Sequence, residues 1–325
     1  MDIYFEKEYA KLYETNTEKV EIFEYSNENG KGRNIFLKRE IPLKINNQIY
    51  YDIITPYGYG GPIFEIKEDI NKQEFIDEYC EKFNEYCGKN NIVSEFVRFH
   101  PLEKNYENLE KFYQIAHISD TIFMDLSSEE EILKNMSSKA RNKIRKGIKN
   151  NLVFEEDKKV SSLEEFKKLY YETMDKNSAS NSYYFDDSYF HKLCELKDKI
   201  KLFVVKDMEQ NILTASLIML KDKNMHYHLT ANSAIGYKYA ANNFLLYNLA
   251  TWGNKNGYEK LHLGGGFGGN DSPLYEFKKS MNEKGILKFC IGKKIYNKEI
   301  YDELVKQRNL TEEEKKNSYF PLYRK

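Results

Sequence analysis

Residues 242–279 read NNFLLYNLATWGNKNGYEKLHLGGGFGGNDSPLYEFKK, and this stretch decides the fold. Apolar side chains follow a helical spacing over Asn242–Asn256, and Gly257 is a typical residue at which a helix stops. Lys260–Leu263 is then predicted as a strand, followed by a glycine-rich loop. Pro273 is a favoured first residue of a helix. The stretch therefore predicts a helix, a strand, a loop and a second helix in this order.

Predicted strands stand before this stretch, and a similar order of elements occurs in the first third of the chain. Ahead of Asn242 we predict three strands, at Lys201–Lys206, Ile212–Lys221 and Met225–Thr230. In the first third we predict a hairpin of two strands, a loop, a helix and a further strand, at Ile35–Lys44, Ile49–Thr55, Thr55–Pro62, Lys72–Tyr86 and Ile92–Phe99. The recurrence predicts an α+β fold in which one layer is duplicated. We expect a first domain over residues 1–125, with 293–325 packing back on it, and a second over 126–292.

Capping residues predict the starts of further helices. A Ser-x-x-Glu capping box follows Asp125, a second helix is expected to be capped by Ser138, and Ser162 with Glu165 predicts a third. The helix after Ser138 has an apolar stripe and no acidic residue before Asn151. Its other side carries a run of basic residues, which includes Arg141, Lys143, Arg145 and Lys146. Helix faces that only meet solvent usually carry both positive and negative side chains, and this face carries positive ones alone. It is therefore either an unusual solvated face or a strip that binds phosphates or an RNA backbone.

Composition excludes several classes of protein. The 325 residues include 50 Lys and Arg against 51 Asp and Glu, so nucleic-acid contacts must be local rather than spread over a basic chain. The aromatic content of 15% argues against disorder, and no apolar run approaches the ~20 residues of a membrane span. The first residues lack a secretory signal pattern, so a cytoplasmic protein is expected. Four scattered cysteines and six histidines predict no disulfide framework, no metal site and no cofactor, although His226 and His228 could share a strand face.

Two loops have unusual compositions. Gly264-x-Gly266-x-x-Gly269 matches the dinucleotide-binding pattern, but the next helix starts late and Phe289 stands where an acidic residue is needed, so nicotinamide or flavin binding is disfavoured. The run can allow close approach of a ligand, or it can be a flexible turn. The loop Thr55–Pro62, with Tyr57 and Tyr59, can stack on a sugar or base, or it can fill a domain interface.

Several segments, in order along the chain, resemble the Fem family of non-ribosomal peptidyl transferases, a part of the wider group of BioF2-like acetyltransferase domains. They are YYDIITPYGYGGP, VRFHPL, DLSS, MSSKARNKIRK, YHLTAN, NNFLLYNLATW, LHLGGG and LYEFKK. The resemblance implies two GNAT-like domains and an acyltransferase that moves an amino acid from aminoacyl-tRNA to an amine of a muropeptide or nucleotide-sugar precursor. It also leaves room for a peripheral approach to a membrane-bound precursor.

The resemblance also implies roles for individual residues. Lys278, preceded by Phe277, matches the family's reaction-centre pair. The residues expected to bind substrate are Lys38, Tyr57, Tyr59, Arg98, Lys176, Gly264, Gly265 and Gly266. Those expected to bind tRNA are Arg141, Lys143, Arg145 and Lys146.

The chain departs from the family at two places. Many relatives have an arginine shortly after the Thr173-Met174 pair, where this chain has Asp175-Lys176, and no long helical arm is predicted. The acyl-CoA loop of ordinary GNAT enzymes is reduced in SAIGYKYAANN to Gly236. Two rival functions stay open. One is a CoA-dependent N-acyltransferase that acts on a surface-glycan amino sugar, and the other is a non-catalytic recognition module.

Overall fold

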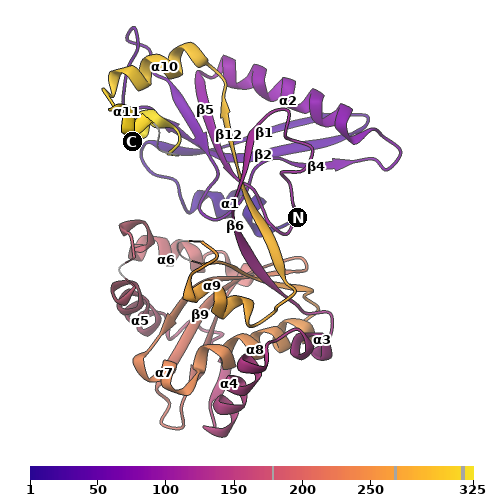
Figure 1. The fold of residues 1–325 in the computed structure, drawn as a ribbon, viewed down its shortest axis with the longest axis vertical. Coiled ribbons are helices and arrows are strands. Elements are labelled where there is room, and N and C mark those ends of the chain that lie inside the picture. Colours follow the sequence, from indigo (N-terminus) through magenta and orange to yellow (C-terminus); the bar gives the residue numbers. More distant parts are fainter. Residues whose placement is uncertain (178, 267–268, 316–318) are drawn as a thin grey trace. The chain divides into compact units, whose positions relative to one another are not determined.

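The computed structural model describes residues 1–177, 179–266, 269–315 and 319–325. The chain forms two compact units (Figure 1). Unit 1 comprises Met1–Ile3 and Ser119–Lys288, and unit 2 comprises Tyr4–Ile118 and Phe289–Lys325. Strands β6 (Gln114–Asp125) and β12 (Ile286–Ile295) contribute residues to both units. In the described part of the chain, no helix is both long and apolar enough to cross a bilayer.

Unit 1 is built on a mixed sheet with the strand order β6-β11-β10-β9-β8-β7. The bounds not yet given are β7 Val153–Glu156, β8 Ile200–Lys206, β9 Ile212–Lys221, β10 Asn224–Asn232 and β11 Lys260–Gly265. The β10–β11 pair is parallel, and the other neighbouring pairs are antiparallel. The strands predicted at β8 to β11 are confirmed, with ends that differ by a few residues.

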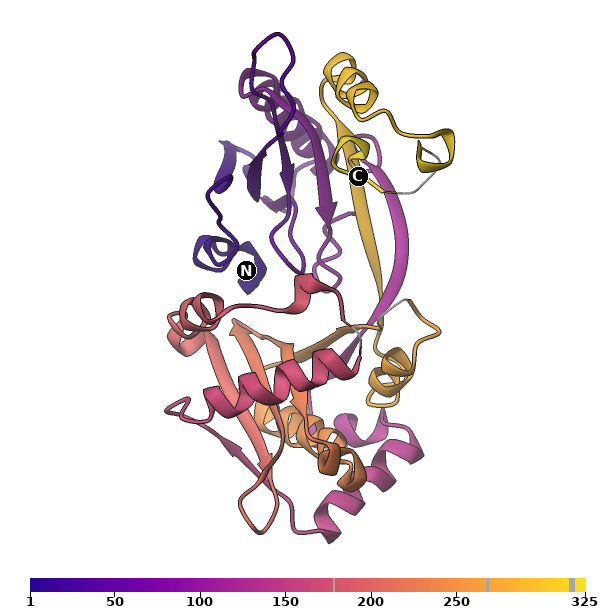
Figure 2. The same cartoon turned by 90° about the vertical axis from the view of Figure 1, so that its left-hand side faces the viewer.

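Helices cover both faces of this sheet. Their bounds are α3 Glu129–Lys134, α4 Ser138–Lys149, α5 Leu163–Lys176, α6 Asp187–Cys194, α7 Ala234–Tyr239, α8 Ala241–Lys255 and α9 Pro273–Lys279. Helix α5 crosses one face (Figure 2), and α8 packs on the other, so β9 between them is buried along nearly its whole length. Helix α4 packs on α8 through Gly147, where an added Cβ would lie 2.9 Å from Phe244.

Two of the predicted caps differ from those observed. Helix α4 is capped by Ser137, whose hydroxyl accepts from the Ala140 N–H, and Ser138 is the first helical residue. Ser162 occupies the cap position of α5, but its side chain makes no cap hydrogen bond. The Asp157 carboxylate accepts from the Ser162 N–H instead, because the chain approaches α5 through a tight turn at 157–162. Helix α7 was not predicted.

The strands of unit 2 follow the order β1-β2-β3-β5-β12, with β4 paired to β2. Its further strands are β1 Glu18–Asn27, β2 Gly30–Glu40, β3 Tyr51–Ile54, β4 Ile63–Ile66 and β5 Ile92–Arg98. Its helices are α1 Lys7–Lys11, α2 Lys72–Lys89, α10 Lys298–Gln307 and α11 Glu312–Lys315. β3 and β5 are parallel, while β2 pairs antiparallel with β1 and β3. Asn46 and Asn47 both have positive φ, as the predicted turn requires.

Each unit thus has a mixed, mostly antiparallel sheet with flanking helices, as the sequence predicted. In unit 2 a long helix, α2, packs its apolar face on this sheet through buried side chains, among them Phe75, Tyr79 and Phe83. Strands β1, β4 and β6 and helix α10 were not predicted.

Candidate active site

The predicted reaction centre lies in unit 1, where β11 leads through the glycine run to α9. The helix starts at Pro273, as predicted from the sequence, and the Ser272 hydroxyl caps it by accepting from the Tyr275 N–H. Gly265 and Gly266 pack too tightly for larger residues: a Cβ at Gly265 would lie 2.9 Å from the Asp120 carbonyl, and one at Gly266 would lie 2.7 Å from the Gly269 carbonyl. The glycines therefore let the loop fold back closely on its neighbours.

The loop is fixed to β6 by a paired contact. The Asn270 amide oxygen accepts from the Asp120 N–H at 2.7 Å, and its NH₂ group donates to the Asp120 carboxylate at 2.9 Å. Gly265, at the end of β11, pairs with Thr121 of β6. The described ends of the glycine run are therefore anchored, and residues 267–268 lie outside the described residues.

Lys278 is buried beneath this loop. Its ammonium Nζ donates to the Gly265 carbonyl at 2.7 Å, and only 8% of the residue is exposed. Among the described residues no carboxylate pairs with it, so the charge is taken from water without a counter-ion. Burial lowers the pKa of Lys278 from its ordinary value of 10.5 to about 8. An ammonium has three N–H groups, and Gly265 uses one of them, so two remain for a bound oxygen.

The neighbours of Lys278 on α9 have different environments. Phe277 packs against the core of unit 1, and Lys279 is half-buried, with its ammonium 5.9 Å from the Tyr275 ring centre. Successive residues of a helix point about 100° apart. Lys278 therefore contacts the glycine run through Gly265, while Phe277 next to it packs into the core of unit 1.

The basic face predicted on α4 is present and mostly exposed. Lys143, Arg145 and Lys146 are exposed, and none of them forms an ion pair with a described carboxylate. Arg141 differs, because its guanidinium donates to the carbonyls of Leu133 and Met136 and holds the end of α3. The structure therefore leaves three of the four predicted tRNA contacts open to solvent and places Arg141 in an internal role.

The tyrosine loop lies in unit 2, where Arg98 holds it. The Arg98 guanidinium donates to the Thr55 carbonyl at 2.5 Å, to Pro56 at 2.9 Å and to Gly58 at 3.2 Å. The Asn105 amide donates to two further loop carbonyls. Burial lowers the pKa of Arg98 to about 10, so the guanidinium stays charged at neutral pH. Arg98 thus acts on the loop backbone.

The two tyrosines of this loop differ in their surroundings. Tyr59 lies within edge-on contact of the rings of Tyr4, His100 and Phe289, at 5.2–5.6 Å between centres. Tyr57 is partly exposed, and its ring stacks on Tyr13 at 5.9 Å between ring centres. Both tyrosines are partly exposed, and Tyr59 has the larger set of ring contacts described here.

The remaining predicted residues lie elsewhere. Lys38, in unit 2, forms an ion pair with Glu21 at 3.2 Å and lies 4.6 Å from the Tyr51 ring centre. Lys176, in unit 1, is exposed and lies 4.0 Å from the ring centre of Tyr237. The predicted residues are thus divided between the two units, with Lys38, Tyr57, Tyr59 and Arg98 in unit 2 and the others in unit 1.

Sequence reasoning missed the residues that hold these loops in place. Asn270 forms two hydrogen bonds to Asp120, and Asn105 forms three to backbone groups, but an asparagine in a loop has many ordinary roles. Asn270 follows the glycine run directly, whereas Asn105 comes more than forty residues after the tyrosine loop and had no such signal in the sequence.

No protein-family model and no curated protein matches the sequence. Among solved structures, FemX aligns with a TM-score of 0.70 at 14% identity, over 93% of this chain and 94% of its own. The fold of the chain resembles that of FemX. A C-terminal domain of a putative lysylphosphatidylglycerol synthetase from Agrobacterium fabrum aligns with a TM-score of 0.54 at 13% identity, over 88% and 87% of the two chains. L-PGS from Bacillus licheniformis aligns with a TM-score of 0.51 at 14% identity, over 85% and 84%.

At these identities the likeness establishes the fold. It confirms, at the level of the fold, the resemblance to the Fem family, and the two mixed sheets with flanking helices agree with the predicted α+β class.

Proposed function

We propose that this protein transfers an aminoacyl group from aminoacyl-tRNA to an amine of a peptidoglycan precursor. The observation that carries the proposal is Lys278, a buried cation that no carboxylate of the described residues pairs with, held beside the glycine run by the Gly265 carbonyl. The likeness of the fold to FemX supports the choice of reaction.

The reaction requires little from the protein beyond positioning and charge. The neutral acceptor amine attacks the carbonyl carbon of the tRNA ester, and the C=O electron pair moves to oxygen. Lys278 in its charged form stabilises this oxyanion through an N–H that Gly265 does not use. When the intermediate collapses, the carbon–oxygen bond to the ribose breaks, and the ribose oxygen takes up the proton that the amine loses.

The lowered pKa of Lys278 sets a pH limit on this role. Because the pKa is about 8, the ammonium form is present at neutral pH and is lost as the pH rises through 8. The acceptor amine must instead lose its proton, which a higher pH favours, because only the neutral amine attacks. We therefore expect kcat to be highest near or below pH 8.

The donor tRNA is proposed to contact the exposed side of α4. Lys143, Arg145 and Lys146 form a basic strip there without acidic neighbours on the helix. Such a strip supplies phosphate contacts that do not depend on sequence.

The test is to incubate the full chain with a muropeptide precursor and either charged tRNA or acetyl-CoA, and to weigh the products by mass spectrometry. The proposal expects an added aminoacyl mass only with charged tRNA, abolished by RNase. Acetylation from acetyl-CoA would contradict it in favour of the CoA-dependent rival. Binding of the precursor without turnover would contradict it in favour of a recognition module.

Two neighbouring lysines give a matched pair of variants. Lys278→Met should lower kcat by about 10²–10³, as the loss of one oxyanion donor does in other enzymes, with acceptor binding retained. Lys279→Met should leave kcat nearly unchanged. Equal small effects of both changes would refute the role of Lys278.

A further inference from the structure

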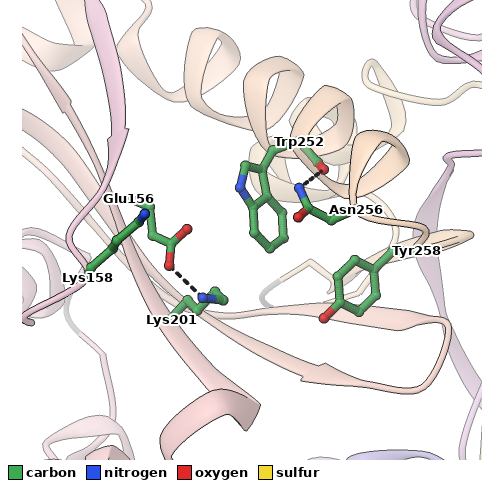
Figure 3. Close-up of a pocket in the computed structure, with 6 residues that line it drawn as sticks. All are labelled: Glu156, Lys158, Lys201, Trp252, Asn256 and Tyr258. Carbon is green, nitrogen blue, oxygen red and sulfur yellow. Dashed lines mark hydrogen bonds and ion pairs between the residues drawn. The ribbon is translucent and has the colours of Figure 1, made fainter.

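A shallow depression of about 430 Å³ lies in unit 1 at the edge of the sheet. It is lined by side chains from β8, from the ends of β7 and α8, and from the turns that follow those two ends, which are Glu156, Lys158, Lys201, Trp252, Asn256 and Tyr258 (Figure 3). The depression opens here because β7 is a short edge strand that ends at Glu156, while α8 continues beyond it to Lys255. None of these residues belongs to the proposed aminoacyl-transfer site.

One side of the depression is aromatic. Trp252 and Tyr258 lie within 20° of parallel, with ring centres 5.9 Å apart. The Trp252 ring makes an edge contact with the ring of Phe203, with 5.0 Å between ring centres. Phe203 in turn stacks on Phe154. The indole is therefore held in one orientation while it stays partly exposed.

The other side is polar, as Figure 3 shows. Glu156 and Lys201 form an ion pair at 2.5 Å, and Lys201 lies 5.8 Å from the Trp252 ring centre. Their side chains are 16% and 29% exposed, so the pair is accessible from the depression. Lys158 is exposed at the rim.

Several hydrogen-bonding groups here are unused. The Asn256 NH₂ group donates to the Trp252 carbonyl at 2.8 Å, which leaves its amide oxygen as an acceptor. Among the described residues, the Trp252 indole N–H and the Tyr258 hydroxyl make no side-chain hydrogen bond. Glu156 has a second carboxylate oxygen, and Lys201 has two further N–H groups. Donors and acceptors thus surround an aromatic surface.

We propose that this depression binds a neutral pyranose ring, such as one sugar unit of a glycan, stacked on Trp252. The apolar face of a pyranose presents C–H groups, which carry partial positive charge and match the negative face of an aromatic ring. Its hydroxyls both donate and accept, and so they match a carboxylate, an amide oxygen and an ammonium placed around that ring.

A nucleotide matches the residues that line the depression less well than a pyranose does. It also stacks on aromatic rings, but its phosphate requires cations that are not neutralised. The Lys201 charge is balanced by Glu156, whose carboxylate would repel a phosphate. Only Lys158 is left, at the exposed rim. The ion pair therefore favours an uncharged ligand.

The depression is separate from Lys278. Tyr258 precedes β11, whereas Gly265, which binds Lys278, is the last residue of that strand. The two sites therefore lie at opposite ends of β11. Sugar binding and aminoacyl transfer can accordingly succeed or fail independently of each other.

Trp252 makes the test direct, because it is the only tryptophan in the chain. The full chain is titrated with methyl glucoside and with N-acetylglucosamine, and intrinsic fluorescence is recorded. A saturable change with a pyranoside, and none with AMP or UMP at the same concentrations, is expected. No saturable change with either sugar would overturn the proposal, and so would a stronger response to the nucleotides.

Two glutamates of β7 provide a matched comparison. Glu156→Gln keeps the size of the side chain but removes its charge, and it should weaken sugar binding by about tenfold. Glu155→Gln, at the adjacent position and paired with Lys206, should leave the affinity unchanged. Equal effects of the two substitutions would contradict the site. If Glu156→Gln fails to fold, Lys158→Ala, an exposed change, takes its place with an expected loss of affinity of a few fold; an unchanged affinity would contradict the site.

Discussion

Replacing Lys278 with methionine should make unit 1 more stable while it removes activity. At pH 7 the lysine is charged in the folded and in the unfolded chain, but only the folded chain buries the charge. The pKa difference between 10.5 and about 8 corresponds to a cost of about 3 kcal/mol at 1.36 kcal/mol per pH unit. Methionine avoids this cost but loses the hydrogen bond to Gly265. We expect Lys278→Met to raise the free energy of unfolding at pH 7 by roughly 1–3 kcal/mol.

The advantage of the methionine variant should depend on pH in a defined window. Between pH 8 and 10.5 the unfolded chain binds the proton of Lys278 more strongly than the folded chain, so the parent gains stability as the pH rises. Above 10.5 the amine is neutral in both states and the cost is gone. The difference in stability between the two proteins should therefore shrink from pH 8 upward and largely vanish near pH 10.5.

The assay is urea unfolding of both proteins at pH 7, 8, 9 and 10, followed by the fluorescence of Trp252, which lies in unit 1 with Lys278. Other groups titrate over this range, but they do so in both proteins and cancel in the difference. Lys279→Met is the control for loss of a neighbouring lysine. A methionine variant that is less stable at pH 7, or a difference that stays constant to pH 10, would refute the reasoning.

Three further predictions concern the basic helix and the tyrosine loop. The double change Lys143→Glu and Lys146→Glu should weaken tRNA binding and lower the slope of log affinity against log salt by roughly 0.7–0.9 per lost phosphate contact; an unchanged slope would mean a solvated face. Arg98→Met should cost roughly 2–4 kcal/mol of stability in circular-dichroism melts, because three loop carbonyls lose a charged donor. Tyr57→Ala should raise the acceptor KM more than it lowers the Tm, and Tyr59→Ala should do the reverse because its ring is packed among others.

Residues that start helices, end helices or form turns gave most of the correct predictions about the fold. Gly257, Pro273 and the Asn46–Asn47 pair determine backbone conformation through their own chemistry, and each acts in the structure as predicted. Strand β1 was not predicted, because charged residues interrupt the alternation of apolar and polar residues that marks a strand. It forms a strand because it pairs with β2 along its whole length. Such pairing depends on tertiary structure and has no local signal.

The sites were predictable only in part for a related reason. The position of Lys278 followed from a motif, but its burial and its contact with Gly265 depend on how α9 packs under β11. Arg98 was assigned to substrate, whereas its partners are carbonyls some forty residues earlier in the chain. The depression around Trp252 combines three separate segments, so no single stretch of sequence could indicate it.

The division of the chain has a consequence for how it is made. Unit 2 is interrupted in sequence by the whole of Ser119–Lys288, and its final strand and helices follow that segment. A ribosome therefore releases nearly all of unit 1 before the last residues of unit 2 exist. Strand β5 is therefore made long before its partner β12, and its edge on that side stays unpaired until residues 286–295 exist. During synthesis the exposed edge of β5 is then the place where this chain is most open to pairing with another nascent copy.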